Sequence, residues 1–241
     1  MTRFSVGDLV YGVARGSYAE SAVAHEDKLA VKPTNLSFER AAVVPTSGLI
    51  AQRGLLDVGQ LQRGQSVLIT GASGGVGSYA VQLAKAFGAE VSAVASTGKV
   101  DLVRSLGADH VIDYTREDFA DGTRRYDLIL DIGGNPTLAR LRRALTPHGT
   151  AVLLGGEQGR GRVTGGFGRT VRAPLLSPFV RQRLAMVTAK ENGRDLERLT
   201  ALIEAGRVTP HIDRSYPLDE LQEAMGRLIA GEVGGKIAIT I

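Results

Sequence analysis

Residues 66–77 read SVLITGASGGVG and decide the fold of this 241-residue chain. An apolar, β-branched run leads into a glycine-rich turn, and a helical pattern starts directly after it. In this context the glycines let the backbone approach a dinucleotide pyrophosphate, and the first amides of the helix face the anion. Ala72 stands where the fingerprint has its first glycine, and Gly77 is expected to let helix and strand pack closely. The predicted contacts at this turn are Ser73, Gly74, Gly75 and Val76.

Short apolar runs alternate with helical patterns from residue 65 onward, which is typical of a parallel sheet covered on both faces. The helix after the first strand is expected to end at Gly88 and the next at Gly107, since glycine suits the left-handed position after a helix. The fold class predicted is therefore α/β, with a Rossmann doubly wound parallel six-stranded sheet. The six predicted strands are Ser66–Thr70, Glu90–Ala95, His110–Asp113, Asp127–Ile132, Thr150–Leu154 and Leu184–Thr188.

The residues after the second predicted strand indicate which coenzyme is bound. An NAD site has an acidic side chain there that accepts hydrogen bonds from the ribose hydroxyls. This chain has residues 95–99, ASTGK, which offer hydroxyl donors and an ammonium group where a 2′-phosphate would carry its charge. We therefore predict NADP(H) rather than NAD(H). The alternative is an ordinary solvated loop with a surface lysine.

The composition excludes several other classes of site. Without cysteine the chain forms no disulfide, thiolate or cysteine-ligated zinc site, and its four histidines lack metal-ligand spacing, so no metal is predicted. The net charge of +4 is too small to indicate nucleic-acid binding. No apolar stretch is long enough for a membrane span, and the start does not resemble a signal peptide, so we expect a cytoplasmic protein without a membrane partner.

The two ends of the chain differ from the sheet region. Residues 1–40 read as a β-rich piece, residues 41–190 as the Rossmann NADP-binding domain, and residues 191–241 as a return of the chain to the first piece. Together the ends are small for a second domain.

Four further stretches occur in an order that resembles a known family. They are residues 6–12 (VGDLVYG), 36–42 (LSFERAA), 106–114 (LGADHVIDY) and 235–237 (GKI), with the glycine turn between the second and third. The chain resembles the medium-chain dehydrogenases/reductases, specifically their zinc-free, quinone-oxidoreductase-like branch. The resemblance implies that residues 1–40 and 191–241 form a GroES-like catalytic domain. Members continue upstream of residues 4–8, so we expect that this domain lacks its start, because the gene model begins late or the chain is a shortened paralogue.

The resemblance also implies functional residues. Ser96, Lys99 and Tyr114 would hold the adenosine 2′-phosphate end of NADPH, while Gly133, Gly155 and Gly156 would line the nicotinamide half. The expected reaction is hydride transfer to a quinone, enone or carbonyl substrate by a homodimer. Ile50 stands where the family usually has threonine, which puts one expected nicotinamide contact in doubt.

No catalytic residue is predicted. Tyr11 and His25 are the ionisable donors of the front piece, yet each is more typical of packing or surface positions. Residues 157–172, rich in glycine and arginine, are expected to form a lid or subunit contact rather than a nucleic-acid tail. Two functional alternatives stay open: a zinc-free alcohol dehydrogenase, and an NADPH-binding protein or fragment without turnover.

Overall fold

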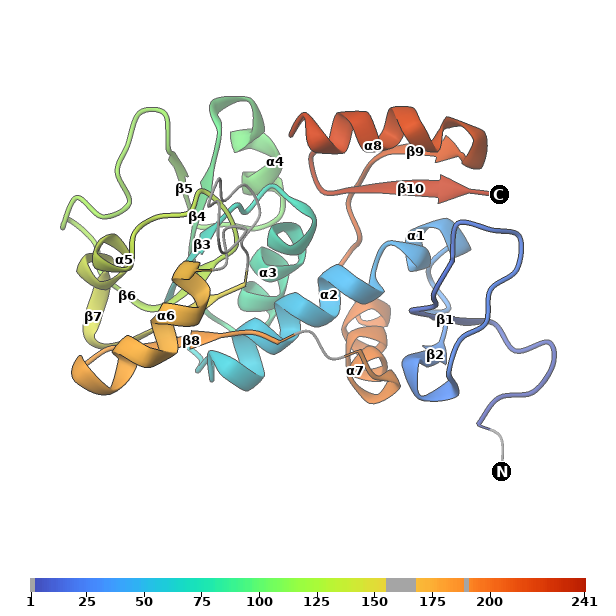
Figure 1. Cartoon of the computed structure of the whole chain (residues 1–241), viewed down its shortest axis with the longest axis horizontal. Helices are drawn as coiled ribbons and strands as arrows, with labels where there is room; N and C mark the ends of the chain where they lie inside the picture. Colours follow the sequence, from blue (N-terminus) through green and yellow to red (C-terminus); the bar gives the residue numbers. More distant parts are fainter. Residues whose placement is uncertain (1–2, 155–167, 189–190) are drawn as a thin grey trace. The chain divides into compact units, whose positions relative to one another are not determined.

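The computed structural model of the chain describes residues 3–154, 168–188 and 191–241 (Figure 1). Contacts divide the chain into two compact units. One unit is Ile50–Thr188, and the other combines Met1–Leu49 with Ala189–Ile241. Residues 41–49, which the sequence analysis grouped with the sheet, thus belong to the unit built from both chain ends.

The unit Ile50–Thr188 contains a six-stranded sheet in the order β5-β4-β3-β6-β7-β8, and all of its strands are parallel. The chain starts in the middle at β3, moves outward to β5, returns to β6 beside β3, and then moves to β8. This is the doubly wound order, so the predicted fold class is confirmed for this unit. The strands are β3 (Ser66–Thr70), β4 (Glu90–Ala95), β5 (His110–Asp113), β6 (Tyr126–Asp131), β7 (Leu145–Leu153) and β8 (Arg183–Met186).

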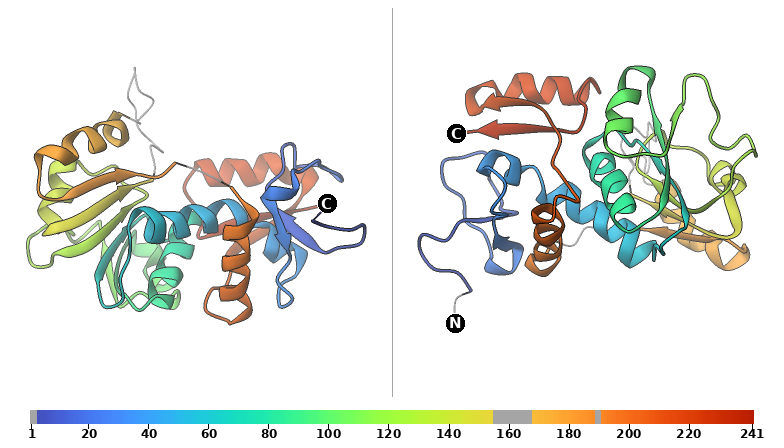
Figure 2. Two further views of the ribbon diagram at one scale, coloured as in Figure 1. Left: turned by 90° about the horizontal axis from the view of Figure 1, so that it is seen from below. Right: turned by 180° about the vertical axis from the view of Figure 1, so that it is seen from behind.

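Helices connect the parallel strands. Since such crossovers are right-handed, helices that follow β3 and β4 cover one face and those that follow β6 and β7 cover the other. Figure 2 shows α3 and α6 on opposite faces of the sheet. Within the described ranges, no helix combines the length and apolar character that a membrane span requires. Helix α2 (Pro45–Gln52) begins in the other unit and ends in this one. The remaining helical elements of this unit are the π-helical turn η2 (Arg53–Val58), α3 (Gly75–Ala86), η3 (Thr97–Lys99), α4 (Val100–Ser105), α5 (Leu138–Ala144), α6 (Gly168–Leu176) and η4 (Ser177–Phe179).

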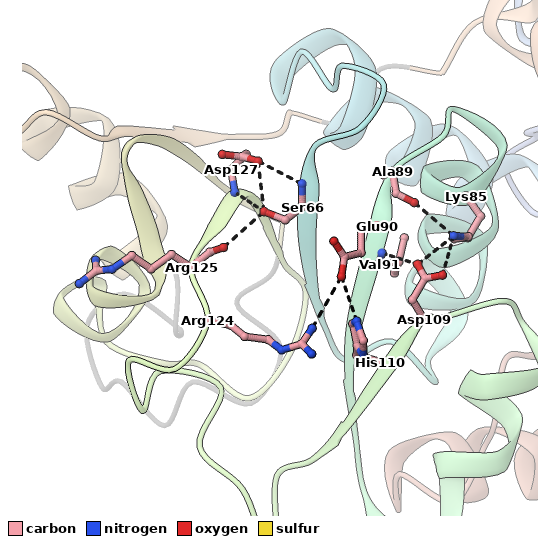
Figure 3. A network of polar contacts seen from close by, with 10 residues as sticks. All are labelled: Ser66, Lys85, Ala89, Glu90, Val91, Asp109, His110, Arg124, Arg125 and Asp127. Carbon is pink, nitrogen blue, oxygen red and sulfur yellow. Dashed lines mark hydrogen bonds and ion pairs between the residues drawn. The ribbon is translucent and has the colours of Figure 1, made fainter.

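The amino ends of the strands are held by polar contacts (Figure 3). At the start of β3, Ser66 donates from its amide and hydroxyl to Asp127 Oδ2, at 3.0 and 3.1 Å. At the start of β4, Glu90 Oε1 lies 2.9 Å from His110 Nε2. Lys85 Nζ lies 2.8 Å from both oxygens of Asp109. These contacts occupy the amino edge, whereas ligands of such sheets bind at the carboxyl edge.

The unit built from the chain ends has two small sheets. Strand β1 (Val10–Gly12) pairs antiparallel with β2 (Leu29–Val31), and β9 (Ile212–Pro217) pairs in parallel with β10 (Lys236–Thr240). Helix α1 packs against β1 and β10, and α7 packs against β2. Residues 41–49 are joined to this unit by contacts such as that of Lys236 Nζ in β10, which donates to Ser47 Oγ at 3.1 Å. The helical elements are η1 (Glu26–Lys28), α1 (Phe38–Ala42), α7 (Gly193–Glu204), η5 (Leu218–Glu220) and α8 (Leu221–Ile229).

Tyr11 joins β1 to α7. Its ring is buried, and its hydroxyl lies 3.1 Å from the carbonyl oxygen of Leu196 and 3.0 Å from Thr200 Oγ1. Burial raises the pKa of Tyr11 to about 12, against the effect of the Thr200 hydrogen bond. Tyr11 is therefore a packing residue of this unit, as the sequence analysis considered typical of such a position.

The Tyr11→Phe variant should unfold more easily by about 1–2 kcal/mol at neutral pH, because it loses both hydroxyl contacts. The raised folded-state pKa means that this tyrosine stabilises the fold fully below its unfolded-state pKa of 10.0 and loses that contribution as pH rises through about 12. Urea unfolding of both proteins at pH 7, 10 and 11.5 measures the difference. It should shrink above pH 10, and a constant difference would contradict this role.

Candidate coenzyme-binding site

The glycine turn after β3 leaves the start of α3 open. Gly74 is the N-cap residue with extended backbone angles (φ −83°, ψ −179°), and no side chain among the described residues caps it. The first turn of α3 also lacks an acidic residue. Because the first amides of a helix have no intrahelical acceptor and carry the positive end of its dipole, they suit an anionic ligand. The amides of Gly75 and Val76 belong to this first turn.

Two other glycines make the turn possible by their lack of a side chain. Gly71 has φ +64°, and a Cβ atom there would lie 3.1 Å from the amide nitrogen of Gly133. A Cβ atom on Gly77 would lie 2.2 Å from the carbonyl oxygen of Gly71 and 2.6 Å from Cα of Ala72. Gly77 therefore lets α3 begin directly against the turn, as predicted, and the loop after β6 brings Gly133 against the same turn.

A buried pair that sequence reasoning missed holds this loop in place. Thr70, the last residue of β3, donates from Oγ1 to Asp131 Oδ1 at 3.0 Å, and both side chains are buried. The same oxygen accepts from the amides of Ile132 and Gly133, at 3.0 and 3.2 Å. In the sequence, the available signal for this pair was a polar residue at the carboxyl end of each of two otherwise apolar strands. The pair joins β3 and β6 where the strand order reverses, which is where such folds bind ligands.

The predicted adenosine residues lie at the neighbouring strand ends. Ser96 follows β4 as the N-cap of η3, and Lys99 ends that turn; both are half-buried. Tyr114 follows β5 with 61% of its surface exposed, and its amide donates to the carbonyl oxygen of Ala95 at 3.2 Å. The amide of Ala72 donates to Val94, at 3.1 Å. These bonds tie the ends of β3, β4 and β5 into one edge, and the bond from the Gly133 amide to Thr70 adds the loop after β6 to it.

One acidic residue at this edge was also missed. The sequence has no acid directly after β4, yet the parallel register places Asp113 of β5 beside Ala95 of β4. Thr97 Oγ1 donates to Asp113 Oδ2 at 2.6 Å, and this hydrogen bond leads the contacts that lower the pKa of Asp113. The sequence analysis counted the Thr97 hydroxyl among the donors for a phosphate; in the structure this hydroxyl is bound to Asp113.

The remaining candidate residues add nothing to this edge in the described part of the chain. Gly155, Gly156 and most of the glycine- and arginine-rich stretch lie outside the described residues, so the predicted nicotinamide contacts there and the lid stay predictions. Ile50 lies half-buried in α2. His25 is exposed, and its Nδ1 atom lies 2.7 Å from Asp27 Oδ1.

The described residues provide no group of side chains that could hold a zinc ion. The sequence has no cysteine, and among the described residues no three histidine, aspartate or glutamate side chains are grouped so that they could hold a metal ion. A dinucleotide does fit, since the open start of α3 and the glycines around it provide room and hydrogen-bond donors for a diphosphate.

Comparison with known proteins agrees with this arrangement. Residues 106–239 match the family of zinc-binding dehydrogenases. The chain is 37% identical over 97% of its length to 2-methylene-furan-3-one reductase of Solanum lycopersicum and covers 57% of that protein. It superposes over its full length on 74% of the quinone oxidoreductase from Coxiella burnetii, with 28% identity and a TM-score of 0.87. It also superposes over its full length on 76% of mycobacterial Rv1454c, which was solved in complex with NADPH, with 26% identity and a TM-score of 0.82.

These matches extend over only part of each relative's own length. The chain spans between half and two thirds of the length of the first curated relatives that it matches. The similarity therefore establishes the family and the sheet unit, while activity and substrate are matters for proposal.

Proposed function

The chain belongs to the zinc-binding dehydrogenase family, one of the medium-chain dehydrogenases/reductases, and from this premise we propose that it is an NADPH-dependent oxidoreductase that acts without zinc. Its proposed substrates are quinones, conjugated enones or simple carbonyls, in line with the quinone and furanone oxidoreductases that it resembles. The observation that carries the proposal is the uncapped start of α3 beside a strand edge that presents Ser96 and Lys99.

The coenzyme is proposed to lie along the carboxyl edge of the sheet. The amides of Ser73, Gly75 and Val76 bind its diphosphate, because helix starts of this kind donate several hydrogen bonds to one anion. The Gly74 amide donates to the carbonyl oxygen of Gly71 at 3.1 Å, so Gly74 contributes the close approach of its backbone to the coenzyme. Ser96, Lys99 and Tyr114 bind the adenosine end, where the ammonium group of Lys99 balances the charge of a 2′-phosphate. Gly133 lies against the turn and allows the coenzyme to pass close to the backbone on its way to the nicotinamide side.

The chemistry is divided between coenzyme and protein. When bound, the reduced nicotinamide supplies the hydride. The chain supplies position: the Thr70–Asp131 pair fixes the loop at Gly133, and this loop and the glycine turn keep the coenzyme in one orientation. Solvent is the proposed proton source, since the hydroxyl of Tyr11 is engaged with α7 and His25 is an exposed partner of Asp27.

The test is a steady-state assay of the purified chain. Loss of NADPH absorbance is followed with a quinone, a conjugated enone and an aldehyde, and each reaction is repeated with NADH. We expect turnover with NADPH and the quinone or enone. Faster turnover of the aldehyde, with oxidation of the alcohol in reverse, would identify the zinc-free alcohol dehydrogenase instead. Tight NADPH binding without turnover of any substrate would identify the non-catalytic binding protein.

Two finer properties are also proposed, the first on the family resemblance and the second on the composition of the chain. The protein is a homodimer, and it resides in the cytoplasm. Light scattering during size-exclusion chromatography tests the first, with a mass twice that of the chain expected. Fractionation of the source cells tests the second.

A further inference from the structure

We propose that Thr97 determines the coenzyme preference by keeping the Asp113 carboxylate occupied, so that this carboxylate neither repels a 2′-phosphate nor accepts hydrogen bonds from the ribose hydroxyls of NADH. The proposal rests on the proposed coenzyme site and deepens it. It assigns a role to two residues that the sequence analysis did not list as site residues.

The sheet register puts the carboxylate at the adenosine end of the site. Sites for NAD have an acid at the end of the second strand, which here is β4 and ends at Ala95. In this chain β4 pairs with β5 so that Ala95 stands beside Asp113. An acid is thus present at this edge, one strand further along. If the coenzyme carries a 2′-phosphate, the negative charge of this acid must be directed away from the phosphate or balanced by nearby donors and cations.

The contacts of Asp113 do this. Its Oδ2 atom accepts from Thr97 Oγ1 at 2.6 Å. Its Oδ1 atom accepts from the hydroxyl and amide of Thr115, at 2.7 and 3.0 Å. Arg116 Nε lies 3.7 Å from Oδ2 and adds a positive charge on the same side. A carboxylate has about four acceptor positions, so these donors take up most of its capacity.

Thr97 differs from the other donors in its place in the chain. Thr115 is two residues from Asp113 and forms a local turn with it, whereas Thr97 comes from η3, the turn that also presents Ser96 and Lys99. The Thr97–Asp113 hydrogen bond therefore covers the carboxylate oxygen that faces η3.

The carboxylate is ionised at neutral pH, since its hydrogen bonds, chiefly that from Thr97, lower the pKa of Asp113. Only 7% of the residue is exposed. Removal of the Thr97 hydroxyl would free an ionised oxygen on the side of the proposed phosphate. A free carboxylate oxygen repels a phosphate and accepts from vicinal hydroxyls, and both effects shift the preference toward NADH.

The experiment compares dissociation constants of NADPH and NADH for the full chain, measured by calorimetry, in wild type, Thr97→Val, Thr97→Ser and the double variant Thr97→Val/Asp113→Asn. Thr97 is exposed, so valine disturbs no core packing there. Thr97→Val should reduce the preference for NADPH over NADH about five- to tenfold. Thr97→Ser keeps the hydroxyl and should retain the preference. The double variant should recover it, because asparagine carries no charge.

The outcomes separate this proposal from the function on which it depends. If wild type binds neither coenzyme, the proposed function fails. If wild type prefers NADPH and Thr97→Val keeps that preference, or if Thr97→Ser loses it equally, the role of Thr97 is refuted. Equal weakening of both coenzymes by Thr97→Val would indicate a merely structural role and would also refute it. The single Asp113→Asn variant provides a second test, since it should bind NADPH at least as selectively as wild type.

Discussion

The Gly77→Ala variant is expected to bind NADPH at least about 100-fold more weakly than wild type. The added methyl group would lie 2.2 Å from the carbonyl oxygen of Gly71 and 2.6 Å from Cα of Ala72. Both obstacles are backbone atoms, so no side-chain rotation relieves the overlap. The start of α3 must move away from the turn, which displaces the amides that bind the diphosphate. We also expect a loss of about 3 kcal/mol in the free energy of unfolding.

A matched control is Gly226→Ala in α8. There no described atom lies within 4 Å of the position that a Cβ atom would take. Alanine favours the helix by about 1 kcal/mol over glycine, so this variant should be slightly more stable than wild type. Coenzyme titration and urea unfolding of the three proteins give both quantities. Wild-type affinity in folded Gly77→Ala would contradict the close packing described for the turn.

The Lys99→Ala variant is expected to weaken NADPH binding by about 1.5–3 kcal/mol, or roughly 10- to 150-fold, and to leave NADH binding nearly unchanged. Lys99 ends the turn after β4, and the 2′-phosphate is the group by which the two coenzymes differ. The variant loses a charge-assisted hydrogen bond to the 2′-phosphate in the NADPH complex, whereas the NADH complex has no such bond to lose.

Lys85→Ala is the control for the general loss of a positive charge. Lys85 binds Asp109 at the amino ends of the strands, opposite to the proposed coenzyme edge (Figure 3). Its removal should change the two affinities equally and by little. Equal weakening of both coenzymes in Lys99→Ala would show that this lysine does not recognise the phosphate.

The sequence predicted the central part of the sheet unit well because local signals agree there. Residues 66–77 combine the apolar run Val67–Ile69 with glycines that the backbone requires, and the structure places β3, the turn and α3 accordingly. Strand β7 shows the limit of such signals. The strand was predicted from Thr150, whereas it begins at Leu145 and includes Pro147 and Gly149, two residues typical of turns, where its register with β6 shifts.

The part of the site that could not be predicted depends on register between distant segments. Asp113 belongs to a stretch that looked like an ordinary strand end, and only its pairing with β4 brings it beside Ala95. Thr70 and Asp131 likewise meet because β6 returns to the side of β3. The spacing of residues along the sequence does not show which of them meet across neighbouring strands; strand order and register do.

Calorimetric titration of the purified chain with NADPH and, separately, with NADH tests the central claim most directly, namely that the open start of α3 and the strand end at Lys99 bind a phosphorylated dinucleotide. Saturable heat with both, and markedly tighter binding of NADPH, is the predicted result. Absence of saturable heat with either coenzyme would contradict it.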